Sequence, residues 1–90
     1  MSASKTVQIC NRRGLHARAS AKFVTMASSL PAQVEVEKDG SKVVGTSIMG
    51  LMMLGAALGD HITISASGDG AEQAVATLAE LVEARFHEAE

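Results

Sequence analysis

The chain has 90 residues, of which 47% are apolar, so it can form one small domain with a thin core but not two. One cysteine excludes an internal disulfide, and the near absence of aromatic residues argues against a surface that stacks nucleic-acid bases. The net charge of −2 is unevenly distributed, because residues 1–22 contain five basic and no acidic residues, while the other 68 contain three basic and ten acidic ones. The basic segment is predicted to face phosphate, nucleic acid or an acidic partner.

No segment has the pattern of a leader or a membrane anchor. The first six residues lack the apolar core of a signal peptide. The longest apolar stretch, residues 48–58, is interrupted by glycines and is too short to cross a bilayer. We therefore expect a soluble, cytoplasmic protein without membrane insertion, made of a single domain over residues 1–90.

The first half of the chain predicts a strand, a helix and two further strands. Residues 5–9 alternate and are rich in β-formers, which indicates a strand, and residues 11–14 form a loop. Apolar residues then recur at helical spacing from about residue 17 until Pro31 ends the helix. Residues 33–37 and 41–44 are predicted strands that a hairpin turn joins.

The second half predicts a helix, a strand and a helix. Ser47 is the expected N-cap of a short helix over residues 48–54, and residues 61–67 alternate as a fourth strand. The spacing of Asp69 and Glu72 resembles a capping box, and an apolar stripe behind it, up to Phe86, predicts the final helix. The resulting βαββαβα order predicts an α+β sandwich with helices on one face of a mainly antiparallel sheet.

The junction between the first strand and the first helix holds the strongest candidate site. The first turn of a helix has unpaired backbone N–H groups and a partial positive charge, which suit a phosphate. His16 stands at this entrance, Arg18 adds a permanent cation, and Gly14 permits a tight loop. A neutral imidazole has one nitrogen lone pair and is a candidate nucleophile. The alternative is that His16 only caps the helix and that Arg18 is a solvated charge.

Residues 14–18 (Gly-Leu-His-Ala-Arg) resemble the active-site motif of the HPr family, the histidine phosphocarriers of the phosphoenolpyruvate-dependent phosphotransferase system. Residues 47–50 (Ser-Ile-Met-Gly) resemble the regulatory serine region of that family, at its usual distance downstream. Residues 62–68 are similar to its last strand, so the resemblance covers essentially the whole chain.

The resemblance implies a fold and an activity. The fold is an open-faced β-sandwich, in which three helices cover one face of a four-stranded antiparallel sheet. The activity is that of a stoichiometric phosphocarrier rather than an enzyme: enzyme I phosphorylates Nδ1 of His16, and an EIIA-type protein then receives the phosphoryl group. Arg18 would stabilise this group, and the loop and helix start at Gly14, Ala17 and Ala19 would surround it. We expect a monomer that needs no cofactor, metal ion or nucleic acid.

Ala19 departs from the family pattern, which usually has proline at this position. Proline in a first helical turn fixes φ and removes an unneeded N–H, whereas alanine keeps the helix and adds one backbone donor. The form of the motif in this sequence resembles the alphaproteobacterial regulatory branch of the family. The resemblance therefore implies phosphotransfer, in a sugar or a nitrogen-type branch, rather than sugar uptake specifically.

Ser47 has two compatible roles. As an N-cap it is worth about 1 kcal/mol to its helix. The resemblance also implies regulatory phosphorylation by an HPr kinase/phosphorylase, and that phosphate would place roughly two negative charges beside the docking surface. A different function stays open on this basis, a regulatory interaction module that acts through Ser47 while phosphoryl transfer by His16 is secondary.

The helix behind Ser47 has more large apolar side chains than two turns can bury. About half of them are predicted to lie in the core, and the rest to form an exposed, methionine-rich surface for partners. The resemblance favours Ile48, Met49 and Met52 as the exposed part, next to His16.

The remaining candidates are weaker. Cys10 has no second thiol nearby for a metal site, and is predicted to be a strand-end residue. His61 and His87 have no partner at ligand spacing. A small anion- or RNA-binding module is a third possible function, and the ten acidic residues and the lack of aromatic residues count against it.

Overall fold

The structure is a computed structural model that describes residues 1–88, and its elements follow the predicted chain order. They are β1 (Ser2–Gln8), α1 (Ala17–Ser28), β2 (Gln33–Lys38), β3 (Ser41–Val44), α2 (Ile48–Met53), β4 (His61–Ser67) and α3 (Ala71–Glu83), followed by the short turn η1 (Arg85–His87). The predicted single domain over residues 1–90 includes residues 89 and 90, which lie outside the described residues.

The four strands form one antiparallel sheet in the order β1-β4-β2-β3, so β4 lies between β1 and β2. Alternation of side chains gives this sheet an apolar and a polar face. On the apolar face, Ile64 is opposite Val36, and both side chains are fully buried. On the polar face, Thr6 is opposite Thr63, and their hydroxyl oxygens lie 2.9 Å apart. The pairing of these strands leaves one face of the sheet for the helices.

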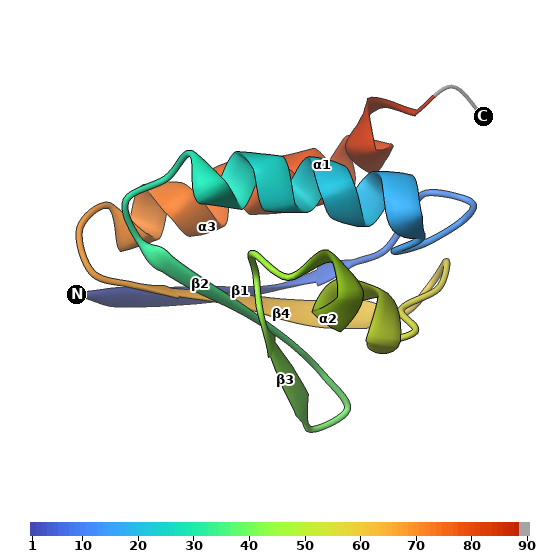
Figure 1. Ribbon diagram of the computed structural model, residues 1–90, viewed down its shortest axis with the longest axis horizontal. Helices are drawn as coiled ribbons and strands as arrows, with labels where there is room; N and C mark the ends of the chain where they lie inside the picture. Colours follow the sequence, from blue (N-terminus) through green and yellow to red (C-terminus); the bar gives the residue numbers. More distant parts are fainter. Residues whose placement is uncertain (89–90) are drawn as a thin grey trace.

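The helices close the apolar side of the molecule. Figure 1 shows α1 and α3 side by side on one face of the sheet. The helix α3 packs on β1 and β4, whereas α2 packs against α1 and β3. The core between helices and sheet contains the fully buried side chains of Phe23, Leu51, Leu78 and Phe86. This arrangement confirms the predicted open-faced sandwich of four antiparallel strands and three helices.

The prediction was wrong at both ends of α3. Asp69 is not the cap of this helix, because Gly70 takes the N-cap position with a left-handed backbone (φ 74°) and no side-chain capping bond forms. The helix ends at Glu83 instead of continuing to Phe86. Phe86 is nevertheless fully buried, because the chain turns back toward the core in η1 and inserts the ring there. The apolar stripe therefore correctly predicted burial of Phe86, but not its secondary structure.

The bounds of β1 also differ from the predicted residues 5–9. The strand begins at Ser2 because its pairing with β4 extends to Ser67, and it ends at Gln8. Ile9 follows the strand, and its backbone N–H donates to the carbonyl of Asp60 at 2.7 Å. This bond fixes the start of the loop that leads to α1.

Candidate functional site

His16 lies at the N-terminus of α1, as predicted. It is the N-cap of the helix, with an extended backbone, and its Nδ1 accepts a hydrogen bond from the backbone N–H of Arg18 at 3.3 Å. Its carbonyl accepts from the N–H of Ser20 at 2.9 Å, which begins the helical ladder. The imidazole is 21% exposed. His16 can therefore cap the helix and still present its ring to a reactant in solvent, because 21% of the side chain is exposed.

The loop before His16 is held by a close backbone contact at Gly14. Gly14 has φ +65°, and a Cβ atom at this position would lie 2.3 Å from the carbonyl oxygen of Ala56. The next residue, Leu15, donates its backbone N–H to the same oxygen at 2.9 Å. Only glycine fits this approach of two backbones, so Gly14 fixes where the loop delivers the imidazole.

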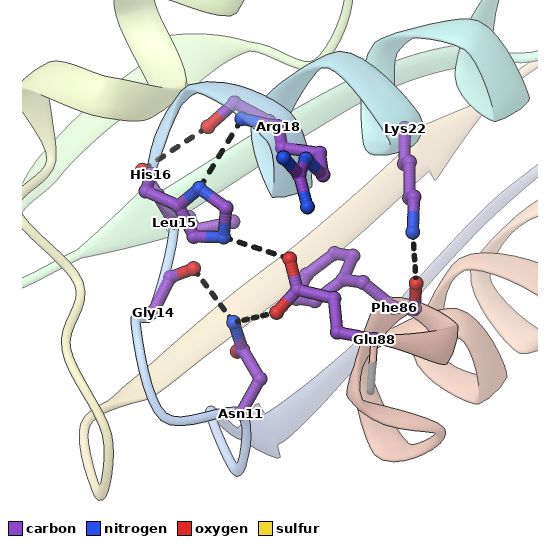
Figure 2. A network of polar contacts seen from close by, with 9 residues as sticks. Asn11, Gly14, Leu15, His16, Arg18, Lys22, Phe86 and Glu88 are labelled. Carbon is purple, nitrogen blue, oxygen red and sulfur yellow. Dashed lines mark hydrogen bonds and ion pairs between the residues drawn. The ribbon is translucent and has the colours of Figure 1, made fainter. Parts of the chain in front are cut away.

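A carboxylate from the segment after α3 meets the other side of the imidazole (Figure 2). Glu88 Oε2 lies 2.7 Å from Nε2 of His16. The second oxygen of the same carboxylate, Oε1, accepts from Nδ2 of the fully buried Asn11 at 3.1 Å. Asn11 Nδ2 also donates to the carbonyl of Gly14 at 2.9 Å. One amide group thus joins the loop, the carboxylate and, through it, the imidazole.

The neighbours of the ring decide which nitrogen carries its proton. A backbone N–H can only donate, so Nδ1 faces Arg18 as an unprotonated acceptor. A carboxylate can only accept, so Nε2 carries the proton that it donates to Glu88. The arrangement therefore selects the neutral tautomer whose free lone pair is on Nδ1, at the helix N-terminus.

The carboxylate of Glu88 is held in its charged form. Burial of this group would raise its pKa, but the hydrogen bonds from His16 and Asn11 outweigh that effect and hold the pKa below its ordinary value of 4.5. Lys22 adds a smaller contribution in the same direction. At neutral pH, Glu88 is consequently a negative charge next to the imidazole.

The segment that carries Glu88 adopts an unusual backbone. Arg85, Phe86 and His87 have φ values of 57°, 54° and 55°, which side-chain-bearing residues rarely adopt. Burial of the Phe86 ring anchors the segment. The backbone carbonyl of Phe86 also accepts a hydrogen bond from Nζ of Lys22 on α1 at 2.7 Å. We call residues 85–88 the C-terminal hook. The hook directs Glu88 back toward the start of α1 (Figure 2).

The predicted cation and helix-start residues lie in the first turn of α1, directly after His16. Arg18 is exposed in the first turn of α1, and within residues 1–88 its guanidinium makes no hydrogen bond or ion pair. Ala17 is exposed, whereas Ala19 is fully buried and packs into the core. The first-turn amides of a helix have no acceptor within the helix itself. The structure therefore brings His16, Arg18 and these amides together.

Ser47 caps α2 as predicted. Its Oγ accepts a hydrogen bond from the N–H of Gly50 at 2.9 Å, and its side chain is partly exposed. Among the six large apolar residues that follow it, only Leu51 and Leu54 are buried.

The expected exposed residues Ile48, Met49 and Met52 are 42%, 71% and 44% exposed, and Met53, at 79%, joins them. We call these four side chains the α2 patch. Because α2 packs against α1, the patch belongs to the helical side of the molecule that also carries His16.

The other candidates have ordinary roles. Cys10 follows β1, and its thiol lies 3.4 Å from the carbonyl of Val82 at the end of α3. His61 and His87 are exposed. Within residues 1–88, no three His, Cys, Asp or Glu side chains are arranged to hold a metal ion. None of the helices in this part of the chain combines the length and the apolarity needed to cross a membrane.

Sequence reasoning missed three residues of this network: Asn11, Lys22 and Glu88. Glu88 is separated from His16 by 72 positions, and no local pattern connects them. The prediction that Phe86 lies in a continuous helix also hid the contact, because a helix would carry Glu88 away from α1. No sequence signal pointed to Asn11 either, because the sequence predicts only a loop at residues 11–14 and the burial of its side chain is seen in the structure.

Comparison with known proteins identifies close relatives over the whole chain. A family model described as the PTS HPr component phosphorylation site matches residues 3–84. The phosphocarrier protein HPr of Neisseria meningitidis serogroup A is 44% identical over 86 residues, which cover 96% of this chain and 97% of that protein.

Two solved structures from Thermoanaerobacter tengcongensis have the same fold. The crystal structure of HPr-C-His superposes with a TM-score of 0.92 at 44% identity, and covers 98% of this chain and 99% of the other. The crystal structure of an HPr dimer has a TM-score of 0.76 at 46% identity, with 91% and 94% of the two chains covered.

Proposed function

Because the chain belongs to the HPr family and is a phosphocarrier of the phosphotransferase system, we propose that His16 is the residue that carries the phosphoryl group. The observation that supports this assignment is the tautomer of the ring. Its unprotonated Nδ1 points at the N-terminus of α1, while Nε2 carries the proton. A nitrogen lone pair at a helix N-terminus combines a nucleophile with an anion site.

The transfer follows from this geometry. The proposed donor is a phosphohistidine of another protein. The Nδ1 lone pair of His16 attacks phosphorus as the bond from phosphorus to the donor's ring nitrogen breaks, and that nitrogen keeps the electron pair of the bond. Once Nδ1 is bonded to phosphorus it cannot accept the hydrogen bond from Arg18 N–H, so this amide becomes available to a phosphoryl oxygen. The Arg18 guanidinium, exposed beside the ring, adds a positive charge.

The partners that we propose are enzyme I as donor and an EIIA-type protein as acceptor. Two surface features suit such partners: a basic segment, residues 1–22, without any acidic residue, and the exposed α2 patch. Apolar centres with polar rims are the usual anatomy of protein interfaces. We propose that the protein is a monomer, although the related HPr from Thermoanaerobacter tengcongensis has a dimer structure.

We further propose that this is a stoichiometric carrier in the cytoplasm and not an enzyme, with residues 1–90 as a single domain and no cofactor, metal ion or nucleic acid involved. Its substrate in this view is the phosphohistidine of another protein, which a small surface site can receive. The branch that it serves, sugar transport or nitrogen-type regulation, is decided by the acceptor.

Ser47 is the proposed regulatory site, with an HPr kinase/phosphorylase as the enzyme that modifies it. Its hydroxyl is partly exposed at the start of α2, beside the α2 patch, so a phosphate there would add negative charge to the docking surface. The comparisons give no support to the alternative in which Ser47 signals and phosphoryl transfer is secondary.

The deciding experiment is phosphorylation by enzyme I with phosphoenolpyruvate and Mg²⁺. We expect one acid-labile phosphate, located on His16 by peptide mass spectrometry and lost in His16→Ala. His61→Ala is the matched control, because it removes an exposed histidine at the start of β4 and should label normally. Label that survives in His16→Ala would contradict the assignment.

A further inference from the structure

We propose that Glu88 is a positioning residue for phosphoryl transfer, which keeps the proton of His16 on Nε2 and balances the positive charge that the ring gains when Nδ1 binds phosphorus. This inference rests on the proposed function of His16. It concerns a residue beyond the range 3–84 that the family model matches.

The carboxylate of Glu88 is held in a fixed position. The Glu88 side chain is only 9% exposed, and both of its oxygens are engaged by donors from the loop before α1. Oε2 meets His16 Nε2 at 2.7 Å, and Oε1 meets Asn11 Nδ2 at 3.1 Å. A carboxylate held at both oxygens has a fixed orientation, so it can in turn fix the ring that it contacts.

The backbone of the C-terminal hook adopts conformations that are costly for these residues. Three consecutive residues with φ between 54° and 57° cost free energy, and such conformations persist only where the surrounding structure enforces them. Burial of Phe86 and its hydrogen bond from Lys22 enforce the turn. A helix continued through residue 88 would avoid these conformations and would lose the contact with His16. The hook therefore brings a partly buried charge to the imidazole at a conformational cost.

The charge of the His16 ring changes during the transfer step. When Nδ1 forms its bond to phosphorus and Nε2 keeps its proton, the ring itself becomes positively charged. The neighbouring carboxylate stabilises that charge, so no proton has to leave during transfer. When the phosphoryl group moves on to the acceptor, the Nδ1–P bond breaks, its electron pair returns to Nδ1, and the same neutral tautomer is restored.

Two variants separate the charge of Glu88 from its hydrogen bond. Glu88→Gln keeps the size of the side chain and loses the charge, and we expect enzyme I to phosphorylate it about tenfold more slowly. Glu88→Ala loses both charge and acceptor and should be at least as slow. Glu83→Gln is the matched control, because it removes an exposed negative charge at the end of α3, and its rate should stay within about twofold of wild type.

A second readout is independent of transfer. The ¹⁵N chemical shifts of the His16 ring in the unphosphorylated protein report which nitrogen carries the proton. We expect the wild type and Glu83→Gln to have the proton on Nε2, and Glu88→Ala to have a mixture of both tautomers. Unfolding in urea, measured for every variant, shows that the rates compare folded proteins.

The outcomes distinguish this inference from the proposed function. If the wild type is labelled and Glu88→Gln is phosphorylated at the same rate, the proposed role of Glu88 is overturned and that of His16 stays intact. A single Nε2–H tautomer in Glu88→Ala also overturns it. Absence of label in the wild type would instead overturn the proposed function, and with it this role.

Discussion

Two helices of this protein begin with a side chain that accepts a hydrogen bond from a first-turn amide. At α1 the acceptor is Nδ1 of His16, 3.3 Å from Arg18 N, and at α2 it is Oγ of Ser47, 2.9 Å from Gly50 N. The contact in α2 is the shorter one and involves residues of that helix end alone. The histidine makes a longer capping bond and is held at its other nitrogen by Glu88, 72 positions away.

A helix cap depends on its own helix end alone unless a tertiary contact also holds the capping side chain, as Glu88 holds His16. Ser47 does what its local sequence predicts, because an N-cap serine needs only the amides of its own helix. His16 needs partners from the loop before α1 and from the C-terminal hook to select one tautomer. His16, the proposed phosphorylation site, is the position at which distant parts of the chain converge.

The largest expected effect concerns the loop that delivers His16. Gly14→Ala should lower the free energy of unfolding by roughly 2–5 kcal/mol, because φ is +65° and the new Cβ would lie 2.3 Å from the carbonyl of Ala56. The corresponding change in α2, Gly50→Ala, brings Cβ to 3.0 Å from Ser47 Oγ and gains helix propensity. It should stay within about 1 kcal/mol of wild type in urea unfolding. Similar losses in both variants would contradict the contrast between the two helix starts.

The second prediction tests the charge beside the ring. Arg18→Gln should slow phosphorylation by enzyme I on the order of tenfold to a hundredfold, because it removes a cation from the developing phosphoryl charge. Arg13→Gln, an exposed basic residue of the same loop, is the control for the general positive charge of residues 1–22. Initial rates at low and high salt give the measurement. Equal losses in both variants would show that steering by the basic segment, rather than a local contact, explains the effect.

The third prediction concerns the local cap. Ser47→Ala should cost about 1 kcal/mol of stability in urea unfolding, because it removes the acceptor for Gly50 N–H. Its rate of phosphorylation on His16 should be unchanged. Ser47→Asp keeps an acceptor at the cap and adds a negative charge, so it should slow transfer from enzyme I while retaining stability. If Ser47→Ala alone stopped transfer, the conclusion that the Ser47 cap acts only on its own helix would be wrong.

The smallest effect is the dependence of stability on pH. The folded-state pKa of Glu88 lies below its ordinary value of 4.5, so the stabilisation from its charged form is present above that value and is lost as pH falls through the folded pKa. Wild type should therefore be more stable than Glu88→Gln at pH 7, and the difference should shrink below about pH 4. Urea unfolding at both pH values measures it. A difference that grew on acidification would reverse the sign and contradict the contact.

Most of the fold could be predicted from the sequence because its signals are local. Alternation in residues 33–37 and 61–67, the turn at residues 39–40 and the serine cap of α2 each depend on neighbouring residues, and all of them are found. Strand order could not be predicted, because pairing of β4 with both β1 and β2 depends on tertiary packing. The Asp69 cap failed because Gly70 begins α3 with its own backbone conformation.

The candidate site was predictable only in part. His16 before the helix and Arg18 two residues later indicated a candidate anion site at the start of α1, and both residues belong to the motif that resembles the family's active site. Glu88 was hidden because its position depends on the hook, and an apolar stripe that includes Phe86 predicts continued helix. Burial of an aromatic ring does not reveal whether the backbone reaches the core as a helix or as a turn.

The separation of the site in sequence has a consequence for the order of events during synthesis. His16, its loop and the start of α1 leave the ribosome early, whereas β4, which completes the middle of the sheet, and Glu88, 72 positions after His16, leave it late. Non-local pairing of this kind forms only after the intervening chain is available. The growing chain therefore contains the histidine long before it contains the carboxylate that contacts its ring, so the complete site can form only when nearly the whole chain has been made.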